Sequence, residues 1–234
     1  MKKAFIPICL YTNGFFLVKE NLRFFLHIFS DYSELLFVIV DKLYGNNLLI
    51  KDKATDPEDA KRNYEKRGLH IFSHVRNTIQ DYIKSHNSYT KYHIVRWNDI
   101  ANRQEYTEIK QRAIEIFNTN LNLRYYSNMF IIHNLKRMTD KITQRKIELE
   151  HEYLFEEIAM SIYLTEFLEY DHEIWEKPQS EYLPDPIDIL YNEERESLYL
   201  LLEKEYSIRS QYYLAPIINK YLDRFNIRHK HLEE

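Results

Sequence analysis

The most suggestive chemical pair in this sequence is a tyrosine and a glutamate four residues apart. Tyr153 and Glu157 lie in the segment EHEYLFEEIA, which spans residues 150–159. On a helix, residues i and i+4 share a face, so the phenol and the carboxylate would lie one above the other. An apolar stripe runs beside them: Leu154, Ile158, Ile162 and Leu168. A carboxylate beside such a stripe is costly unless a cation pairs with it, and a substrate ammonium group is one such cation. The alternative is a solvent-exposed glutamate.

Composition narrows the class of protein. A length of 234 residues suits one large α/β domain, so we expect residues 1–234 to form a single domain. With 32 basic and 36 acidic side chains, the charge is nearly balanced, and nucleic-acid binding would need a local basic patch. The single cysteine, Cys9, excludes an intramolecular disulfide and a Cys-x-x-Cys zinc site, so we expect a reduced, cytoplasmic setting. No run approaches the roughly 18 apolar residues that span a bilayer.

Glycine is scarce, and this restricts how the chain can bind phosphate. The three glycines are Gly14, Gly45 and Gly68. Neither the G-x-G-x-x-G dinucleotide loop nor the Walker loop can be written with these positions. The sequence therefore excludes both of these phosphate-binding loops.

Apolar periodicity predicts strands that alternate with helices. We expect strands at 4–10, 34–41, 92–97 and 171–175, and helices at 18–29, 57–85, 105–117, 122–149 and 153–169. The helix over 57–85 is expected to be interrupted near Gly68, residues 176–186 to form a loop, and residues 193–225 to be helical and to pack against the sheet. This alternation predicts a doubly wound α/β fold.

The continuous apolar run at 34–41 is typical of a strand that is covered on both faces, as in a parallel sheet. Asp41 would then lie at the carboxyl end of that strand, where open α/β sheets bind ligands.

Five segments, taken in order, resemble the motifs of one enzyme family. They are ICLYTNGFF (8–16), DKLYGNN (41–47), HIVRWN (93–98), YLFEEIA (153–159) and YDHEIW (170–175). This pattern resembles the tRNA-dependent cyclodipeptide synthases, over roughly residues 4–178. The resemblance implies a Rossmann-like domain, with a mostly parallel sheet and helices on both faces. That domain is related to the class I tyrosyl- and tryptophanyl-tRNA synthetases but lacks their ATP-binding signatures.

The resemblance also implies a reaction. Two aminoacyl-tRNAs react in turn through a covalent aminoacyl-enzyme, and the product is a cyclic dipeptide, a diketopiperazine. No cofactor, ATP or metal is implied, because the ester of the charged tRNA is already activated. By position, Glu157 would anchor the α-ammonium group of the first aminoacyl residue, and Tyr153 would hydrogen-bond the same amine.

The chain departs from the family pattern at the nucleophile. The family serine falls on Leu10 when the segment is aligned without a gap, and leucine cannot attack an ester. Cys9, one residue earlier, is the first candidate, because a thiolate is a good nucleophile. Thr12 in the following loop is another candidate. A lone cysteine can also be simply a small buried hydrophobe.

A second departure lies near the end of the matching region. The family tyrosine that assists proton transfer falls on Trp175, whose indole N–H donates a hydrogen bond but cannot relay a proton as a phenol does. Tyr182, in the following loop, is the available substitute.

The resemblance further suggests where substrates bind. We expect the first strand, the turn after Asp41 and the helix at 153–168 to line the aminoacyl pocket, and their mostly apolar side chains point to apolar amino acids. The candidate substrate-binding residues are Ile6, Ile8, Asn13, Asp41 and Asn47. The residues expected to bind tRNA form a basic stripe at helical spacing: Lys61, Arg62, Lys66, Arg76 and Lys84. A second basic cluster, within residues 136–146, is the competing surface, and a solvated helix face is the alternative for either.

Three functions therefore remain open from the sequence. The first is a cyclodipeptide synthase. The second is a non-catalytic homologue that binds aminoacyl-tRNA, which Leu10 and Trp175 favour. The third is a transferase that passes the aminoacyl group to another amine.

Overall fold

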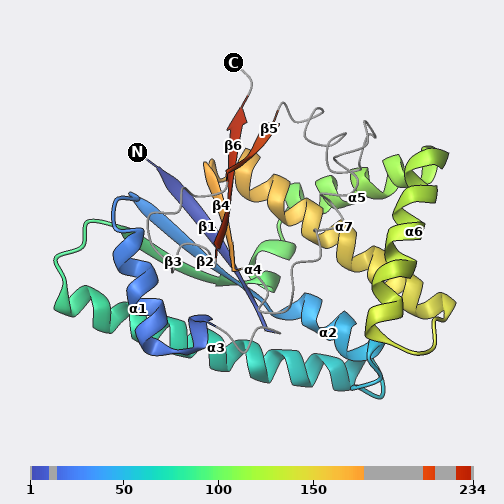
Figure 1. Cartoon of the computed structure of the whole chain (residues 1–234), viewed down its shortest axis with the longest axis horizontal. Coiled ribbons are helices and arrows are strands. Elements are labelled where there is room, and N and C mark those ends of the chain that lie inside the picture. The colour runs from blue at the N-terminus through green and yellow to red at the C-terminus, as the bar shows by residue number, and fades with distance from the viewer. Residues whose placement is uncertain (1, 11–14, 177–207, 214–224, 233–234) are drawn as a thin grey trace.

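A six-stranded sheet forms the centre of the computed structural model, which describes residues 2–10, 15–176, 208–213 and 225–232. The strand order is β3-β2-β1-β4-β6-β5 (Figure 1). The first four strands in this order are mutually parallel: β3 (Lys91–Arg96), β2 (Glu34–Val40), β1 (Lys3–Cys9) and β4 (His172–Glu176). β6 (Phe225–Leu232) runs antiparallel to β4, and β5 (Ile208–Tyr213) runs antiparallel to β6. The predicted doubly wound, mostly parallel α/β fold is confirmed.

Helices cover both faces of the sheet. A short 3-10 turn, η1 (Phe15–Leu17), precedes α1 (Lys19–Ile28), which lies on one face with the long helix α3 (Pro57–Ser85) (Figure 1). The other face carries α4 (Trp97–Ala101), α5 (Gln104–Thr119) and α7 (Gln144–Glu166), and α6 (Leu121–Met138) packs against α5 and α7. The remaining helix, α2 (Asp41–Ile50), follows β2 directly and contacts both α3 and α7.

Strand alternation divides the core into two layers. Along β1, Ala4, Ile6 and Ile8 pack with α1 and α3, and we call this core the α3 layer. Phe5 points to the opposite face and packs with α5 and α7, in what we call the α7 layer. β2 alternates in the same way, which is why its sequence is apolar throughout.

The helix over 57–85 is continuous, so the predicted interruption near Gly68 is wrong. Asp56 caps its first turn by accepting a hydrogen bond from the Asp59 amide at 2.9 Å. Gly68 is buried where α3 crosses the start of α2. A Cβ atom there would lie 2.7 Å from the Asp41 Cβ and closer still to one of its carboxylate oxygens. The glycine therefore permits a close helix crossing and does not end the helix.

Other predicted boundaries also need correction. Asp41 begins α2, a helix that was missing from the elements predicted by apolar periodicity. The two helices expected at 122–149 and 153–169 divide instead at 139–143, because the Thr143 hydroxyl caps α7 by accepting from the Lys146 amide at 3.3 Å.

The carboxy-terminal prediction of a helix over 193–225 is wrong wherever the structure describes it. Residues 208–213 form β5, and Phe225 begins β6. Glu176, expected to begin a loop over 176–186, is the last residue of β4. The rest of that loop and the remainder of the range 193–225 lie outside the described residues. In the part of the chain that is described, no helix combines the length and the apolar character needed to cross a bilayer.

We expect Gly68→Ala to destabilise the protein by about 1–3 kcal/mol, because the new methyl group overpacks the contact with Asp41. In a free helix the same change would stabilise by about 1 kcal/mol. Urea unfolding measures the difference. Ser73→Ala, at an exposed position on the same helix, is the matched control and should be neutral or stabilising. Equal stability of the two variants would contradict the close crossing.

Candidate active site at the carboxyl edge of the sheet

The candidate site lies where the parallel strands end. Cys9, the last residue of β1, is paired with Val40 in β2, and Ile39 is paired with Arg96 at the end of β3. The first residues of α2 and α4 directly follow the last residues of β2 and β3, respectively. The carboxyl ends of these strands therefore bring three sequence-distant segments to one edge, as in other open α/β sheets.

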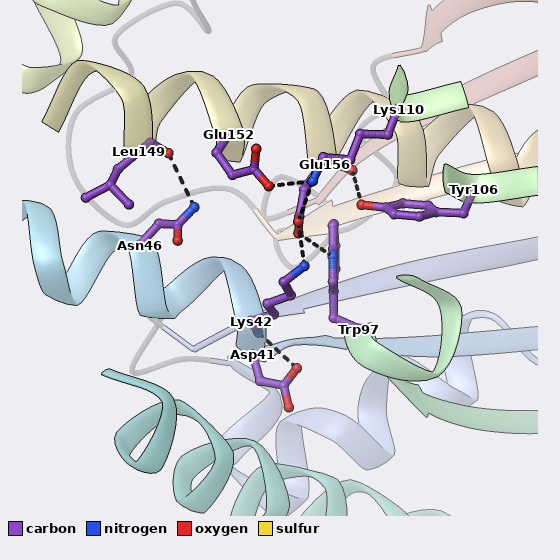
Figure 2. A network of polar contacts seen from close by, with 9 residues as sticks. All are labelled: Asp41, Lys42, Asn46, Trp97, Tyr106, Lys110, Leu149, Glu152 and Glu156. Carbon is purple, nitrogen blue, oxygen red and sulfur yellow. Dashed lines mark hydrogen bonds and ion pairs between the residues drawn. The ribbon is translucent and has the colours of Figure 1, made fainter. Parts of the chain in front are cut away.

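A buried carboxylate holds this edge to α7. Glu156 is 1% exposed and accepts from the Lys42 ammonium at 2.5 Å and from the Lys110 ammonium at 3.0 Å (Figure 2). The indole Nε1 of Trp97 donates to its other oxygen at 3.1 Å. Lys110 also pairs with Glu152, one turn earlier on α7. Glu156 thus links α2, α4, α5 and α7 through side-chain contacts.

The charges in this network shift one another. Burial opposes ionisation of Glu156, but the ammonium groups of Lys42 and Lys110 outweigh it and hold the pKa of its carboxyl below the ordinary value. Burial also opposes the charge on Lys110, and here the carboxylates of Glu152 and Glu156 prevail and raise the pKa of its ammonium. Both shifts favour the charged forms of Glu156 and Lys110. The sequence analysis did not identify Glu156 as the centre of this network. The feature that could have indicated a buried acid is the pair of glutamates at 156–157, which interrupts an apolar run.

Asp41 forms a second ion pair at this edge. Its side chain is fully buried, and the Arg96 Nε donates to its Oδ2 at 2.6 Å. Burial raises the pKa of Asp41, and the Arg96 guanidinium opposes that shift without reversing it. Asp41 was expected to contact substrate, but in this structure its carboxylate lies beneath Gly68 and joins the end of β2 to the end of β3.

Tyr153 and Glu157 lie on α7, as predicted, and both are half-buried. Tyr153 packs against the α7 layer. Glu157 directly follows the buried Glu156, so the network that fixes Glu156 also fixes the turn of helix that carries the candidate ammonium anchor.

Cys9 points to the same face of the sheet as α7. Its register partner Val40 belongs to the α7 layer, and paired residues in a parallel sheet point to the same side. Leu10, at the family serine position, is 1% exposed and packs in the α3 layer. Ile6 and Ile8 pack in that layer too, so the structure does not bring them together with Tyr153 and Glu157.

The other expected site residues are distributed as follows. Asn47 is buried on α2 and lines a pocket together with Leu10. Trp175 lies on β4, where it pairs with Asn226 of β6. Thr12, Asn13 and Tyr182 lie outside the described residues. No cluster of three metal-ligating side chains occurs within the described ranges.

The basic stripe on α3 is exposed along the helix, at Lys61, Arg62, Lys66, Arg76 and Lys84. The competing basic cluster at 136–146 is only partly exposed to solvent. Lys146 is buried there and donates to Asp52 at 2.7 Å and to the Thr139 hydroxyl at 2.8 Å.

Solved structures match the chain over most of its length. A cyclodipeptide synthase from Fluoribacter dumoffii has 16% identity and a TM-score of 0.61, covering 87% of this chain and 82% of that one. A Mycobacterium tuberculosis protein has 12% identity and a TM-score of 0.63, covering 84% and 80%, and is described as showing that cyclodipeptide synthetases are related to type I tRNA synthetases. AlbC, a cyclodipeptide synthase from Streptomyces noursei, has 12% identity and a TM-score of 0.56, covering 74% and 80%. This chain has the cyclodipeptide-synthase fold.

The fold expected from the five sequence motifs is thus confirmed. No protein-family profile matches the sequence, and no curated protein does. At 12–16% identity, the shared cyclodipeptide-synthase fold leaves activity to be argued from the site itself.

We expect Glu156→Gln to destabilise the protein by about 2–4 kcal/mol, because the change leaves two ammonium groups without their shared buried carboxylate. This range lies below the roughly 3–5 kcal/mol typical of a broken buried pair, because Lys42 is 38% exposed and water can solvate it. The matched control is Glu152→Gln on the same helix, where the lost carboxylate is 44% exposed and the cost should be below about 1 kcal/mol.

The same variant should change how stability depends on pH. A carboxyl with a depressed folded-state pKa stabilises above its unfolded value of about 4.3, and this stabilisation is lost as pH falls through the folded pKa. The free energy of unfolding of the wild type should therefore fall more steeply than that of Glu156→Gln below about pH 5. Parallel pH profiles would contradict the ionised network.

Proposed function

We propose that this chain is a cyclodipeptide synthase that uses two aminoacyl-tRNAs. The observation that carries the proposal is the placement of Cys9 at the end of β1, on the sheet face that α7 covers, while α7 carries Tyr153 and Glu157. A nucleophile and an ammonium-binding pair on one face of a cyclodipeptide-synthase fold are the parts that this reaction requires.

In the first half-reaction, the Cys9 thiolate attacks the carbonyl carbon of the ester of the first aminoacyl-tRNA. The bond to the ribose oxygen breaks, that oxygen takes a proton, and a thioester forms on Cys9. Glu157 pairs with the α-ammonium group of the bound residue, and the Tyr153 phenol hydrogen-bonds the same nitrogen.

In the second half-reaction, the α-amine of the enzyme-bound residue attacks the ester of the second aminoacyl-tRNA. A peptide bond forms, and the second tRNA leaves. The free amine of the dipeptide then attacks the thioester, which closes the six-membered ring and returns the thiolate. No ATP is consumed, because each tRNA ester and the thioester are already activated toward amines.

The tRNA would lie along α3 in this proposal. Lys61, Lys66 and Arg76 are exposed on that helix, which approaches the carboxyl edge of the sheet at Gly68. Exposed cations in a row neutralise phosphates and make binding salt-dependent.

Leu10 supports a second candidate, a homologue that binds charged tRNA without catalysis. A buried leucine at the family serine position removes the usual hydroxyl, and only Cys9 then supplies a nucleophile among the described residues at the end of β1. The two candidates differ in whether a cyclic dipeptide accumulates.

We expect bacteria that express the chain to release a diketopiperazine, detected by mass spectrometry of the medium. Cys9→Ala should reduce it to background, because the acyl acceptor is lost. Glu157→Gln should reduce it by about 10- to 100-fold, the effect of losing one charge-assisted hydrogen bond. Glu148→Gln, at an exposed site on the same helix, should not change the yield.

Three outcomes discriminate between the functions. Product that survives Cys9→Ala would exclude Cys9 as the nucleophile and direct attention to Thr12. Binding of charged tRNA without product would favour the non-catalytic homologue. Consumption of charged tRNA only when another amine is added would favour a transferase.

We expect the α3 stripe to set the salt dependence of tRNA binding. Replacing Lys61, Arg62 and Lys66 together by glutamine should lower the slope of log K against log[salt] by about 2, on a basis of 0.7–0.9 per phosphate contact. Fluorescence titration with tRNA at several salt concentrations measures the slope. The control replaces Lys136 and Arg137, which are exposed on α6, and a larger effect there would place tRNA on the competing cluster instead.

A further inference from the structure

A basic pocket lies at the carboxyl end of β1, on the side of the α3 layer. Its volume is about 200 Å³, and its walls include Leu10, Tyr44, Asn47 and Leu48. Three cationic side chains complete the lining: Lys51, Lys53 and Arg67. None of the described residues that line this pocket is acidic.

The fold brings these three cations together from separate places. Lys51 follows the last residue of α2, Lys53 lies in the connection to α3, and Arg67 lies well along α3 itself. The Arg67 guanidinium carbon lies 5.3 Å from the centre of the Tyr44 ring, a cation–π contact that holds it on the pocket wall. Arg67 directly precedes Gly68, so the close crossing of α3 and α2 is what places it there.

The charges of Lys51 and Lys53 repel each other. Burial lowers the pKa of Lys51, and the charge of Lys53 lowers it further, with only partial opposition from the Glu150 carboxylate on α7. A bound phosphate would relieve this repulsion through charge-assisted hydrogen bonds, and arginine binds phosphate oxygens in a bidentate manner.

We propose that this pocket is a phosphate site, and that the phosphate belongs to the 3′ end of aminoacyl-tRNA. The second part rests on the proposed function. The volume is below the roughly 300–1,000 Å³ of pockets that enclose drug-sized ligands, which suits a phosphate and its sugar better than a whole nucleotide.

The position of the pocket fits this assignment. The terminal nucleotide of a charged tRNA carries its ester and its phosphate on the same ribose. A phosphate held beside Leu10 would therefore bring the ester to the end of β1, where Cys9 is the preceding residue. Along α3, the exposed Lys66 is next to Arg67, so the phosphate chain could continue from the pocket onto the basic stripe. Neither glycine-rich phosphate loop can be written in the sequence, and the pocket supplies cationic side chains as phosphate ligands instead.

The test measures binding to the full-length chain of three probes: inorganic phosphate, 5′-AMP, and a fluorescein-labelled RNA minihelix that ends in CCA. Lys53→Gln and Arg67→Gln should each weaken minihelix binding by about tenfold or more, as expected for loss of a charged hydrogen bond. Both should also abolish the rise in melting temperature that phosphate or AMP gives the wild type. Arg67→Lys should bind more tightly than Arg67→Gln but less tightly than the wild type. Lysine keeps the positive charge but cannot make the bidentate hydrogen bonds of arginine.

The matched control is Lys91→Gln. Lys91 is exposed at the amino end of β3, at the opposite edge of the sheet, and its replacement should change none of the affinities. Melting temperatures of the unliganded variants confirm that each one folds.

The outcomes separate this inference from the proposed function. If both pocket variants bind all probes like the wild type, the phosphate site is excluded, whether or not a cyclic dipeptide is made. If phosphate and AMP depend on the pocket but the minihelix does not, the site takes a free phosphate compound and the tRNA assignment is wrong. If minihelix binding depends on the pocket while the wild type makes no cyclic dipeptide, the site stands and the synthase proposal fails.

Discussion

The ion-pair network around Glu156 is the constraint on which the arrangement of the candidate site depends. One carboxylate that is almost completely buried contacts side chains from α2, which follows β2, and from α4 and α5, which follow β3. Apolar residues in place of an entire buried ion-pair network often stabilise a protein about as well, but removal of a single partner leaves a buried charge. The chief effect of the network is therefore to fix the position of α7, the helix that carries Tyr153 and Glu157.

A second constraint acts on the opposite layer. Gly45 and Gly68 have no side chains to separate α2 from α3, and added Cβ atoms would lie 2.7 Å from the Tyr64 ring and from the Asp41 Cβ, respectively. The buried Asp41–Arg96 pair occupies the space that this close crossing leaves. As a result, the exposed basic side of α3 reaches the same edge of the sheet at which Cys9 ends β1.

The two layers suggest a division of chemical roles at that edge. The α7 layer carries carboxylates and a phenol and faces the thiol of Cys9, which suits a positively charged aminoacyl group. The α3 layer presents lysines and an arginine, which suit phosphate. A charged tRNA carries both kinds of group at its 3′ end. Alternation along β1 separates the two environments, since neighbouring residues point to opposite faces.

Much of this was available from the sequence because it depends on local pattern. The apolar run at 34–41 predicted a strand buried on both faces, and the five ordered motifs predicted the cyclodipeptide-synthase fold and the helix that carries Tyr153 and Glu157. Local pattern failed where a distant contact decides the outcome. Gly68 looked like a helix break because only the fold reveals the Asp41 side chain against it. Residues 193–225 were expected to be helical, yet residues 208–213 form β5, and β6, which begins at Phe225, extends the sheet beside β4.

By itself, then, the sequence indicated the four parallel strands β1 to β4, the exclusion of two glycine-rich phosphate loops and the candidate thiol. Only the tertiary structure decided which acid lies at the centre of the network, because Glu156 and Glu157 are neighbours of one type and differ only in what faces them. It also decided that Cys9 and Leu10 point to opposite layers, and that Arg67 joins Lys51 and Lys53 in one pocket. Burial and charge pairing arise between residues far apart in the chain, and so the fold alone fixes them.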